Sequence, residues 1–160
     1  MESKIWWRED APPSDVPATH GAAPCVIAIP ARDEAALIGP CLRALALQED
    51  APQFAVALVL NNCRDDTASV VASMVGELPF PLHVFNIELP PELSDAAWAR
   101  RLAVNAAMSL ASKDGVVLTT DADSRADSKW VRSTLDCFDA GADIVCGFVA
   151  PDFNDAPSLP

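Results

Sequence analysis

The sequence predicts an α/β protein with a mostly parallel sheet and helices on both of its faces. Short apolar, β-branched runs, typical of buried strands, alternate with segments whose apolar residues recur at helical spacing. Regular alternation of strands and helices favours a parallel sheet covered on both sides. The chain has 160 residues, of which 51% are hydrophobic, so it fits one domain with a real core.

Five apolar runs, each followed by turn-forming or polar residues, are predicted to be strands. They are residues 25–30, 55–60, 82–87, 115–120 and 142–150. In chain order they read CVIAIP, AVALVL, LHVFNI, GVVLTT and ADIVCGFVA. The alternation of predicted strands and helices begins at Pro24, so we expect one domain over residues 24–150.

Two helices are predicted within the first half of this domain. In residues 35–48, Ile38, Leu42 and Leu45 recur at helical spacing, and the regular part should begin near Pro40, because proline is tolerated only in the first turn. The second helix, residues 65–76, has a face of valines and methionine. Asp65 or Asp66 is expected to cap it, and Gly76 to end it.

Two further helices follow, and the first of them has the clearest pattern. Residues 94–112 begin at Ser94, the expected cap. Their predicted apolar stripe is Trp98, Leu102, Ala106 and Leu110. The last helix lies within residues 127–141 and should end at Gly141. Its predicted apolar anchors are Trp130, Leu135 and Phe138.

Charge and composition also indicate where the protein is located and which partners it does not bind. The net charge of −12 argues against nucleic-acid binding. No apolar run approaches the roughly 18 residues of a membrane helix. Residues 1–23 are predicted to be a Pro- and Ala-rich arm that carries Trp6 and Trp7, and they do not resemble a signal peptide. We therefore expect a cytoplasmic protein.

The five cysteines include no CxxC pair, and Cys25, Cys41 and Cys146 are expected to be buried thiols.

Polar clusters follow three of the predicted strands. They are residues 30–34 (PARDE), 61–66 (NNCRDD) and 121–127 (DADSRAD). Ligands of open α/β sheets bind at the carboxyl ends of the strands, so the clusters outline one expected pocket. The sequence has neither the glycine fingerprint of dinucleotide enzymes nor a Walker lysine loop, which argues against both classes.

The pair Asp121 and Asp123 is the strongest chemical signal. Side chains at i and i+2 of a strand share a face, so two carboxylates at a strand end would converge and repel each other unless a cation lies between them. Hard oxygen ligands suit Mg²⁺ or Mn²⁺ bridged to a diphosphate. The alternative is that Asp123 and Asp127 simply cap the next helix.

The ordered pattern resembles the family 2 glycosyltransferases of the GT-A fold over residues 24–150. VIAIPARDEAALIGPCLRAL is similar to their first strand and turn, and ALVLNNCRDDTASVV to their second acidic segment. ARRLAVNAAMSLASKDGVVLTTDAD is similar to their helix, strand and DxD motif. The resemblance implies a metal-dependent, inverting transfer of a sugar from a nucleotide-sugar donor to an unidentified acceptor hydroxyl of a glycan, lipid or small molecule.

The resemblance also implies which residues contact the donor. They are Pro30, Ala31, Arg32, Glu34, Asn61, Arg101, Asp121, Ala122 and Asp123. The four after the first strand would lie along the nucleotide, and Asn61 would face the base. Asp121 and Asp123 would hold Mn²⁺ or Mg²⁺ on the diphosphate. Arg101, beside Arg100, stands where the family often has a basic residue near the donor.

Three departures from the family leave alternatives open. Arg32 replaces a usual aromatic ring and Asn61 a usual aspartate, which leaves the base undetermined, although a guanidinium can also stack on a base. The family's catalytic base lies well downstream, so we expect it beyond Pro160, with residues 151–160 a loop leading to an acceptor-binding half. Membrane association of such a longer chain is left open. The rival hypotheses are a non-catalytic nucleotide- or partner-binding module and a GT-A-like nucleotidyltransferase.

Overall fold

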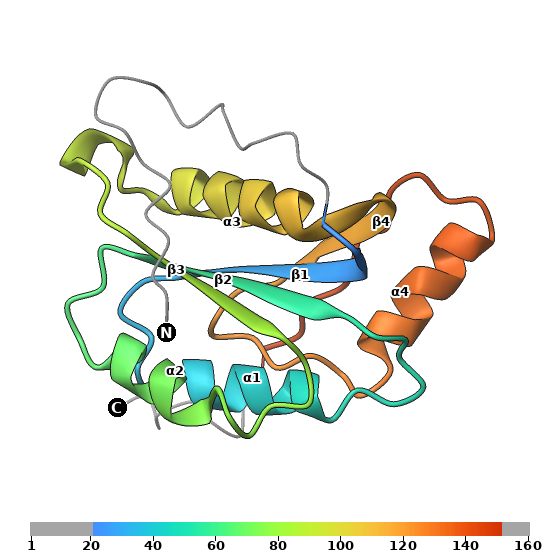
Figure 1. The fold of residues 1–160 in the computed structure, drawn as a ribbon, viewed down its shortest axis with the longest axis horizontal. Coiled ribbons are helices and arrows are strands. Elements are labelled where there is room, and N and C mark those ends of the chain that lie inside the picture. The colour runs from blue at the N-terminus through green and yellow to red at the C-terminus, as the bar shows by residue number, and fades with distance from the viewer. Residues whose placement is uncertain (1–20, 152–160) are drawn as a thin grey trace.

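The sheet is parallel and lies between two helical layers (Figure 1). The computed structural model describes residues 21–151. The strands are β1 (Ala23–Ala31), β2 (Ala55–Asn61), β3 (Leu82–Ile87) and β4 (Ala111–Thr119), in the order β3-β2-β1-β4. Every neighbouring pair is parallel. The predicted fold class is therefore confirmed.

The helices divide between the two faces of the sheet. They are α1 (Ile38–Ala46), α2 (Thr67–Met74), α3 (Ala96–Leu110) and α4 (Trp130–Asp139), with a short 3₁₀ turn at Pro91–Leu93. Figure 1 shows α1 and α2 below the sheet and α3 above it. Residues 1–20 of the predicted arm, which carry Trp6 and Trp7, lie outside the described residues, as do residues 152–160 of the predicted loop. Ala23, predicted to belong to the arm, is the first residue of β1.

The core has two halves because the side chains of β1 alternate between the two faces. Ile27 and Ile29 pack in the cluster that contains the buried residues of α1 and α2. Val26 and Ala28 pack on the other side, with the alanines of α3. All of these side chains are buried. Such a strand cannot slip by one residue without turning both sets to the wrong face.

The buried face of α3 differs from the predicted stripe. Ala99, Ala103, Ala106 and Ala107 are buried, whereas Trp98, Leu102 and Leu110 are only partly buried. The predicted four-residue spacing followed the large side chains. The helix instead faces the sheet with its alanines, whose small side chains let a helix lie close to β1 and β2.

The cap of α3 was predicted one residue too early. Asp95 is the N-cap residue, and its Oδ1 accepts a hydrogen bond of 2.8 Å from the backbone N–H of Trp98. Ser94 lies just outside the helix, and its hydroxyl donates to the carbonyl of Pro91. Both residue types cap helices, so local sequence did not separate them.

The predicted fifth strand, residues 142–150, does not form in the described part of the chain. The chain leaves α4 through Gly141, whose φ of 97° favours glycine, and then runs on without pairing. Ile144 and Phe148 are 82% and 92% exposed. An apolar run becomes a strand only when a neighbour accepts its backbone hydrogen bonds, and composition alone does not supply that neighbour.

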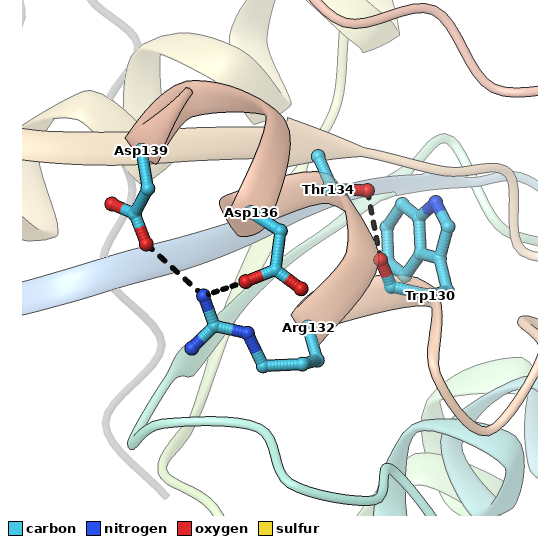
Figure 2. Close-up of polar contacts among 5 residues, drawn as sticks. All are labelled: Trp130, Arg132, Thr134, Asp136 and Asp139. Carbon is cyan, nitrogen blue, oxygen red and sulfur yellow. Dashed lines mark hydrogen bonds and ion pairs between the residues drawn. The ribbon is translucent and has the colours of Figure 1, made fainter. Parts of the chain in front are cut away.

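Helix α4 is anchored by a residue that the pattern did not single out. Val131 is fully buried in the same cluster as α1, while Trp130 and Leu135 are only partly buried. On the same helix, the Arg132 guanidinium bonds the carboxylates of Asp136 and Asp139 at 2.5 and 3.1 Å (Figure 2). These ion pairs join successive turns of the helix.

The cysteines follow the prediction in part. Cys25 and Cys41 are buried, and burial raises the pKa of their thiols to about 11 and about 12. Cys146 was expected to be buried but is exposed, because the segment that carries it does not join the sheet. None of the helices within residues 21–151 is long and apolar enough to span a bilayer.

The cap of α3 gives a test of the fold. Replacing Asp95 by Ala should lower the free energy of unfolding by about 0.5–2 kcal/mol, because the N–H of Trp98 loses its acceptor. Asp95→Asn keeps an acceptor and should cost less, and Ser94→Ala should be close to neutral. Urea denaturation of the three variants measures this, and a larger loss for Ser94→Ala than for Asp95→Ala would contradict the assignment.

Candidate functional site

The turns that follow the strands begin at one edge of the sheet. Ala31 at the end of β1 pairs with Leu60 of β2, and Asn61 pairs with Ile87 at the end of β3. On the other side of β1, Ala28 pairs with Thr119 at the end of β4. Parallel pairing therefore brings the polar clusters after β1, β2 and β4 to the same edge, as predicted.

Two of these turns are tied together by carboxylates. The backbone N–H groups of Arg64 and Asp65 donate to Asp33 Oδ1 at 2.6 and 3.3 Å. In return, the N–H of Ala35 donates to Asp65 Oδ2 at 2.9 Å. Asp33 has a left-handed backbone, with φ of 56°, which aspartate tolerates better than most residues. Each turn thus satisfies backbone donors of the other.

Thr67 completes this connection from the first turn of α2. It is fully buried, and its hydroxyl accepts a hydrogen bond of 2.8 Å from the N–H of Glu34. The same hydroxyl donates to Asp65 Oδ1, and the backbone N–H of Thr67 donates to that oxygen at 3.0 Å. Glu34 and Asp65 are therefore held by one buried group.

The end of β2 carries a buried amide with one unsatisfied atom. Asn61 is 1% exposed, and its Nδ2 donates to the carbonyl of Ser94 at 3.5 Å. Its Oδ1 is buried and has no hydrogen-bond partner among the described residues. Arg32 donates to the same Ser94 carbonyl at 2.6 Å. The Ser94 carbonyl therefore joins the two residues that depart from the family pattern.

Asn62 fixes the segment that carries this carbonyl. Its Nδ2 donates to the carbonyl of Leu89 at 2.9 Å, and its Oδ1 accepts from the N–H of Leu89 at 3.0 Å. Asn62 has φ of 52°, a left-handed conformation in which asparagine is several-fold enriched. The end of β2 and the segment after β3 are thus held together by a paired contact.

Asp121 and Asp123 lie in a turn rather than on a strand. β4 ends at Thr119, and the N–H of Ser124 donates to the carbonyl of Asp121 at 3.1 Å. The prediction that the two carboxylates share one face of a strand end is therefore wrong, because neither residue belongs to a strand. Ala122 lies between the two exposed aspartates in sequence and is itself buried, so its side chain anchors the turn to the rest of the protein. Asp121 Oδ1 accepts a hydrogen bond of 2.5 Å from the guanidinium of Arg100 on α3.

The electrostatics indicate a concentration of negative charge. Partial burial raises the pKa of Glu34, and the carboxylates of Asp123, Asp65, Asp33 and Asp121 raise it further. The hydrogen bond from the Thr67 hydroxyl, together with backbone N–H groups, lowers the pKa of Asp65. The edge therefore favours a cation, either a basic side chain or a metal ion.

The donor set fits a divalent cation completed by a ligand rather than by protein alone. Within residues 21–151, no group of three His, Cys, Asp or Glu side chains could by itself hold a metal ion. Mg²⁺ and Mn²⁺ prefer oxygen, and Mg²⁺ is commonly held by one or two carboxylates, with water and substrate phosphates supplying the rest. Asp121 and Asp123 offer such carboxylates on one exposed turn.

The remaining predicted residues divide between the backbone and α3. Pro30 and Ala31 are the last residues of β1, and Ala31 is buried. Arg101 lies over the ring of Trp98, 5.1 Å from its centroid, so Arg100 is the arginine that reaches the acidic turn.

Sequence reasoning missed the residues that connect the turns. Asp33 and Asn62 are predicted only as members of the polar clusters, and Asp65 also as a possible helix cap. The signal available was positional, because polar residues at strand ends often satisfy backbone groups of neighbouring turns. Which turn each would reach depends on the strand order, and the strand order is not a local property.

A separate groove lies at the opposite, amino edge of the sheet. It has a volume of about 530 Å³ and is lined by residues such as Pro52, Phe54 and Phe80. Its described lining contains no charged side chain. It therefore offers nothing that would neutralise a phosphate or hold a metal ion.

Comparison with known proteins identifies a family and solved structures with a similar fold. The sequence profile of the family described as glycosyl transferase family 2 matches residues 26–158. No curated protein sequence gives a match. Two structures of S. aureus TarS residues 1–349, one in complex with UDP, superpose with a TM-score of 0.58 at 22% identity. They cover 72% and 76% of this chain, which spans 32% of theirs.

A longer structure of S. aureus TarS gives the same result. Its TM-score is 0.56 at 23% identity, with 76% of this chain and 20% of that chain covered. Identities this low show a shared fold. The chain thus corresponds to about a third or less of the length of these structures.

Thr67 tests the connection between the turns. Thr67→Val keeps the shape but removes the hydroxyl that bonds Glu34 and Asp65, so the free energy of unfolding should fall by about 1–3 kcal/mol. The amide of Glu34 should also lose its protection from hydrogen exchange. Thr67→Ser keeps the hydroxyl and should keep that protection. An unchanged Glu34 exchange rate in Thr67→Val would contradict the assignment.

Proposed function

The chain belongs to glycosyl transferase family 2, and from that premise we propose that it binds a nucleotide-sugar donor at the carboxyl edge of its sheet. The sugar would pass from the nucleoside diphosphate to an acceptor hydroxyl with inversion, in a reaction that depends on a divalent cation. Glycosyl transfer is the family's chemistry. The cation and the inversion are proposed from the chemistry of this edge and from the family resemblance.

The observation that carries the proposal is the unpaired amide oxygen of Asn61. A buried acceptor without a partner costs about 1–3 kcal/mol, so a ligand N–H that fills it is favoured. Since the amide nitrogen already donates to Ser94, Asn61 offers a ligand an acceptor. Uracil and thymine N3–H and guanine N1–H are donors that match it. Cytosine and adenine have a ring nitrogen acceptor at the corresponding place.

The other residues complete a site for base, nucleotide and diphosphate. Arg32 lies beside Asn61 through their shared Ser94 carbonyl, and its planar guanidinium can stack on any base. Pro30, Ala31 and Glu34 would border the nucleotide, because they end β1 and begin its turn. Asp121 and Asp123, with Ala122 between them, would hold Mg²⁺ or Mn²⁺ against the diphosphate.

The proposed transfer needs the leaving diphosphate to be neutralised. A bound divalent cation would supply that charge. On the protein side, Arg100 is a basic group that already contacts Asp121. The acceptor hydroxyl would attack the anomeric carbon from the face opposite the diphosphate and lose its proton to a base.

Asp123 tests the cation site. UDP binding should require Mn²⁺ or Mg²⁺, because without a cation the diphosphate meets the acidic turn directly and is repelled. Asp123→Ala should weaken cation-dependent UDP binding more than about tenfold, or ~1.4 kcal/mol, with the fold intact. Calorimetry with and without EDTA measures this. Asp139→Ala on α4 removes an equal charge and is the control. Equal UDP binding with and without the cation would refute the proposal.

Asn61 tests the base contact. Wild-type protein should bind UDP, dTDP and GDP more tightly than CDP and ADP. Asn61→Leu has a similar volume but no acceptor, and it should reduce that preference by about two- to tenfold, the range of one hydrogen bond. Asn61→Asp keeps an acceptor and should keep the preference. If Asn61→Leu ranks the five nucleotides as the wild type does, Asn61 does not contact the base.

A further inference from the structure

The ion pair between Arg100 and Asp121 occupies one of the two carboxylates proposed to hold the cation. Arg100 reaches the turn from α3, the helix on the opposite face of the sheet from α1 and α2. Its guanidinium nitrogen lies 2.5 Å from Asp121 Oδ1, and the two side chains are 47% and 50% exposed. Both groups are therefore accessible to solvent and free to exchange partners.

A guanidinium and a metal ion cannot both use the same carboxylate oxygen at full strength. The lone pairs of Asp121 Oδ1 already accept a charge-assisted hydrogen bond from Arg100. Direct coordination of a divalent cation by that oxygen would also place two positive groups side by side. Arg100 thus offsets part of the negative charge of Asp121.

Resting on the proposed function, we propose that Arg100 is a positioning residue that exchanges with the divalent cation on Asp121. When the cation arrives with a diphosphate, Arg100 leaves Asp121 and pairs with phosphate oxygens, which match its planar fork. The exchange makes cation and diphosphate binding cooperative. Binding of the cation to Asp121 releases Arg100 to pair with the diphosphate, and pairing of Arg100 with the diphosphate releases Asp121 to bind the cation. The coupling between the two ligands is therefore reciprocal.

The exchange predicts opposite effects on the two steps of binding. In wild-type protein the free cation must displace Arg100, so Mn²⁺ alone should bind weakly and UDP should strengthen its binding markedly. Arg100→Met keeps a long side chain but removes the competitor. Mn²⁺ alone should then bind about two- to fivefold more tightly, the range of an exposed ion pair. The strengthening by UDP should shrink, because the diphosphate has lost its guanidinium.

Mn²⁺ binding, followed by the electron paramagnetic resonance signal of free Mn²⁺, tests the exchange with and without UDP. The matched control is Arg132→Met, which removes an arginine paired with two aspartates on α4 (Figure 2). It makes the same change in net charge at a distance from the turn. Arg100→Lys should behave between wild type and Arg100→Met, because an ammonium pairs with Asp121 without the fork. Circular dichroism confirms that each variant is folded.

The outcomes separate the exchange from the donor site itself. Tighter Mn²⁺ binding and weaker coupling in Arg100→Met, with neither in Arg132→Met, supports the exchange. Unchanged or weaker Mn²⁺ binding in Arg100→Met overturns it, and so does an equal gain in Arg132→Met, which would be a general charge effect. If wild-type protein shows no cation-dependent UDP binding at all, the proposed donor site fails and the exchange fails with it.

Discussion

Parallel pairing of β1 with both of its neighbours is the constraint on which the rest of the structure depends. β1 is buried on both faces, and β2 and β4 run in its direction on either side. Parallel strands point in the same direction, so their carboxyl ends meet at one edge of the sheet, where the turns that follow them begin. Arg32, Asn61 and Asp121 are distant in sequence but come to this edge because the strands before them are parallel.

The turns at this edge are held in place by polar groups rather than by apolar packing. The carboxylates of Asp33 and Asp65 each accept hydrogen bonds from backbone N–H groups of the other turn. The hydroxyl of Thr67 accepts a further hydrogen bond from the N–H of Glu34. Partial burial raises the pKa of Glu34, and the neighbouring carboxylates, which repel one another, raise it further. Arg100 offsets part of the negative charge of Asp121. We propose that these charges make the edge selective for a cation together with a diphosphate. The cation would pair with the carboxylates and the diphosphate with Arg100, so neither ligand alone would pair with both.

The sequence predicted what depends on local pattern and missed what depends on distant partners. Residues 82–87 were predicted to be a strand and match β3 in both bounds, because a short apolar run lies there between prolines and polar residues. Residues 142–150 have a similar composition but no partner strand within residues 21–151, so the strand predicted there does not form. Ser94 and Asp95 are both good caps, and only the geometry chose Asp95. The position of Asn61 was predictable, but its burial and unpaired oxygen were not.

The most direct test of the central claim is paramagnetic broadening of backbone amide signals by Mn²⁺ and UDP in the ¹⁵N-labelled protein. Our account predicts the strongest broadening at residues 120–124, then in the turns at 32–35 and 61–67, and none around Phe54 and Phe80 at the opposite edge. Diamagnetic Mg²⁺ with UDP serves as the reference. Strongest broadening at the amino edge, or along the acidic surface of α4, would contradict the account, because the ligand would then bind away from the strand ends that parallel pairing brings together.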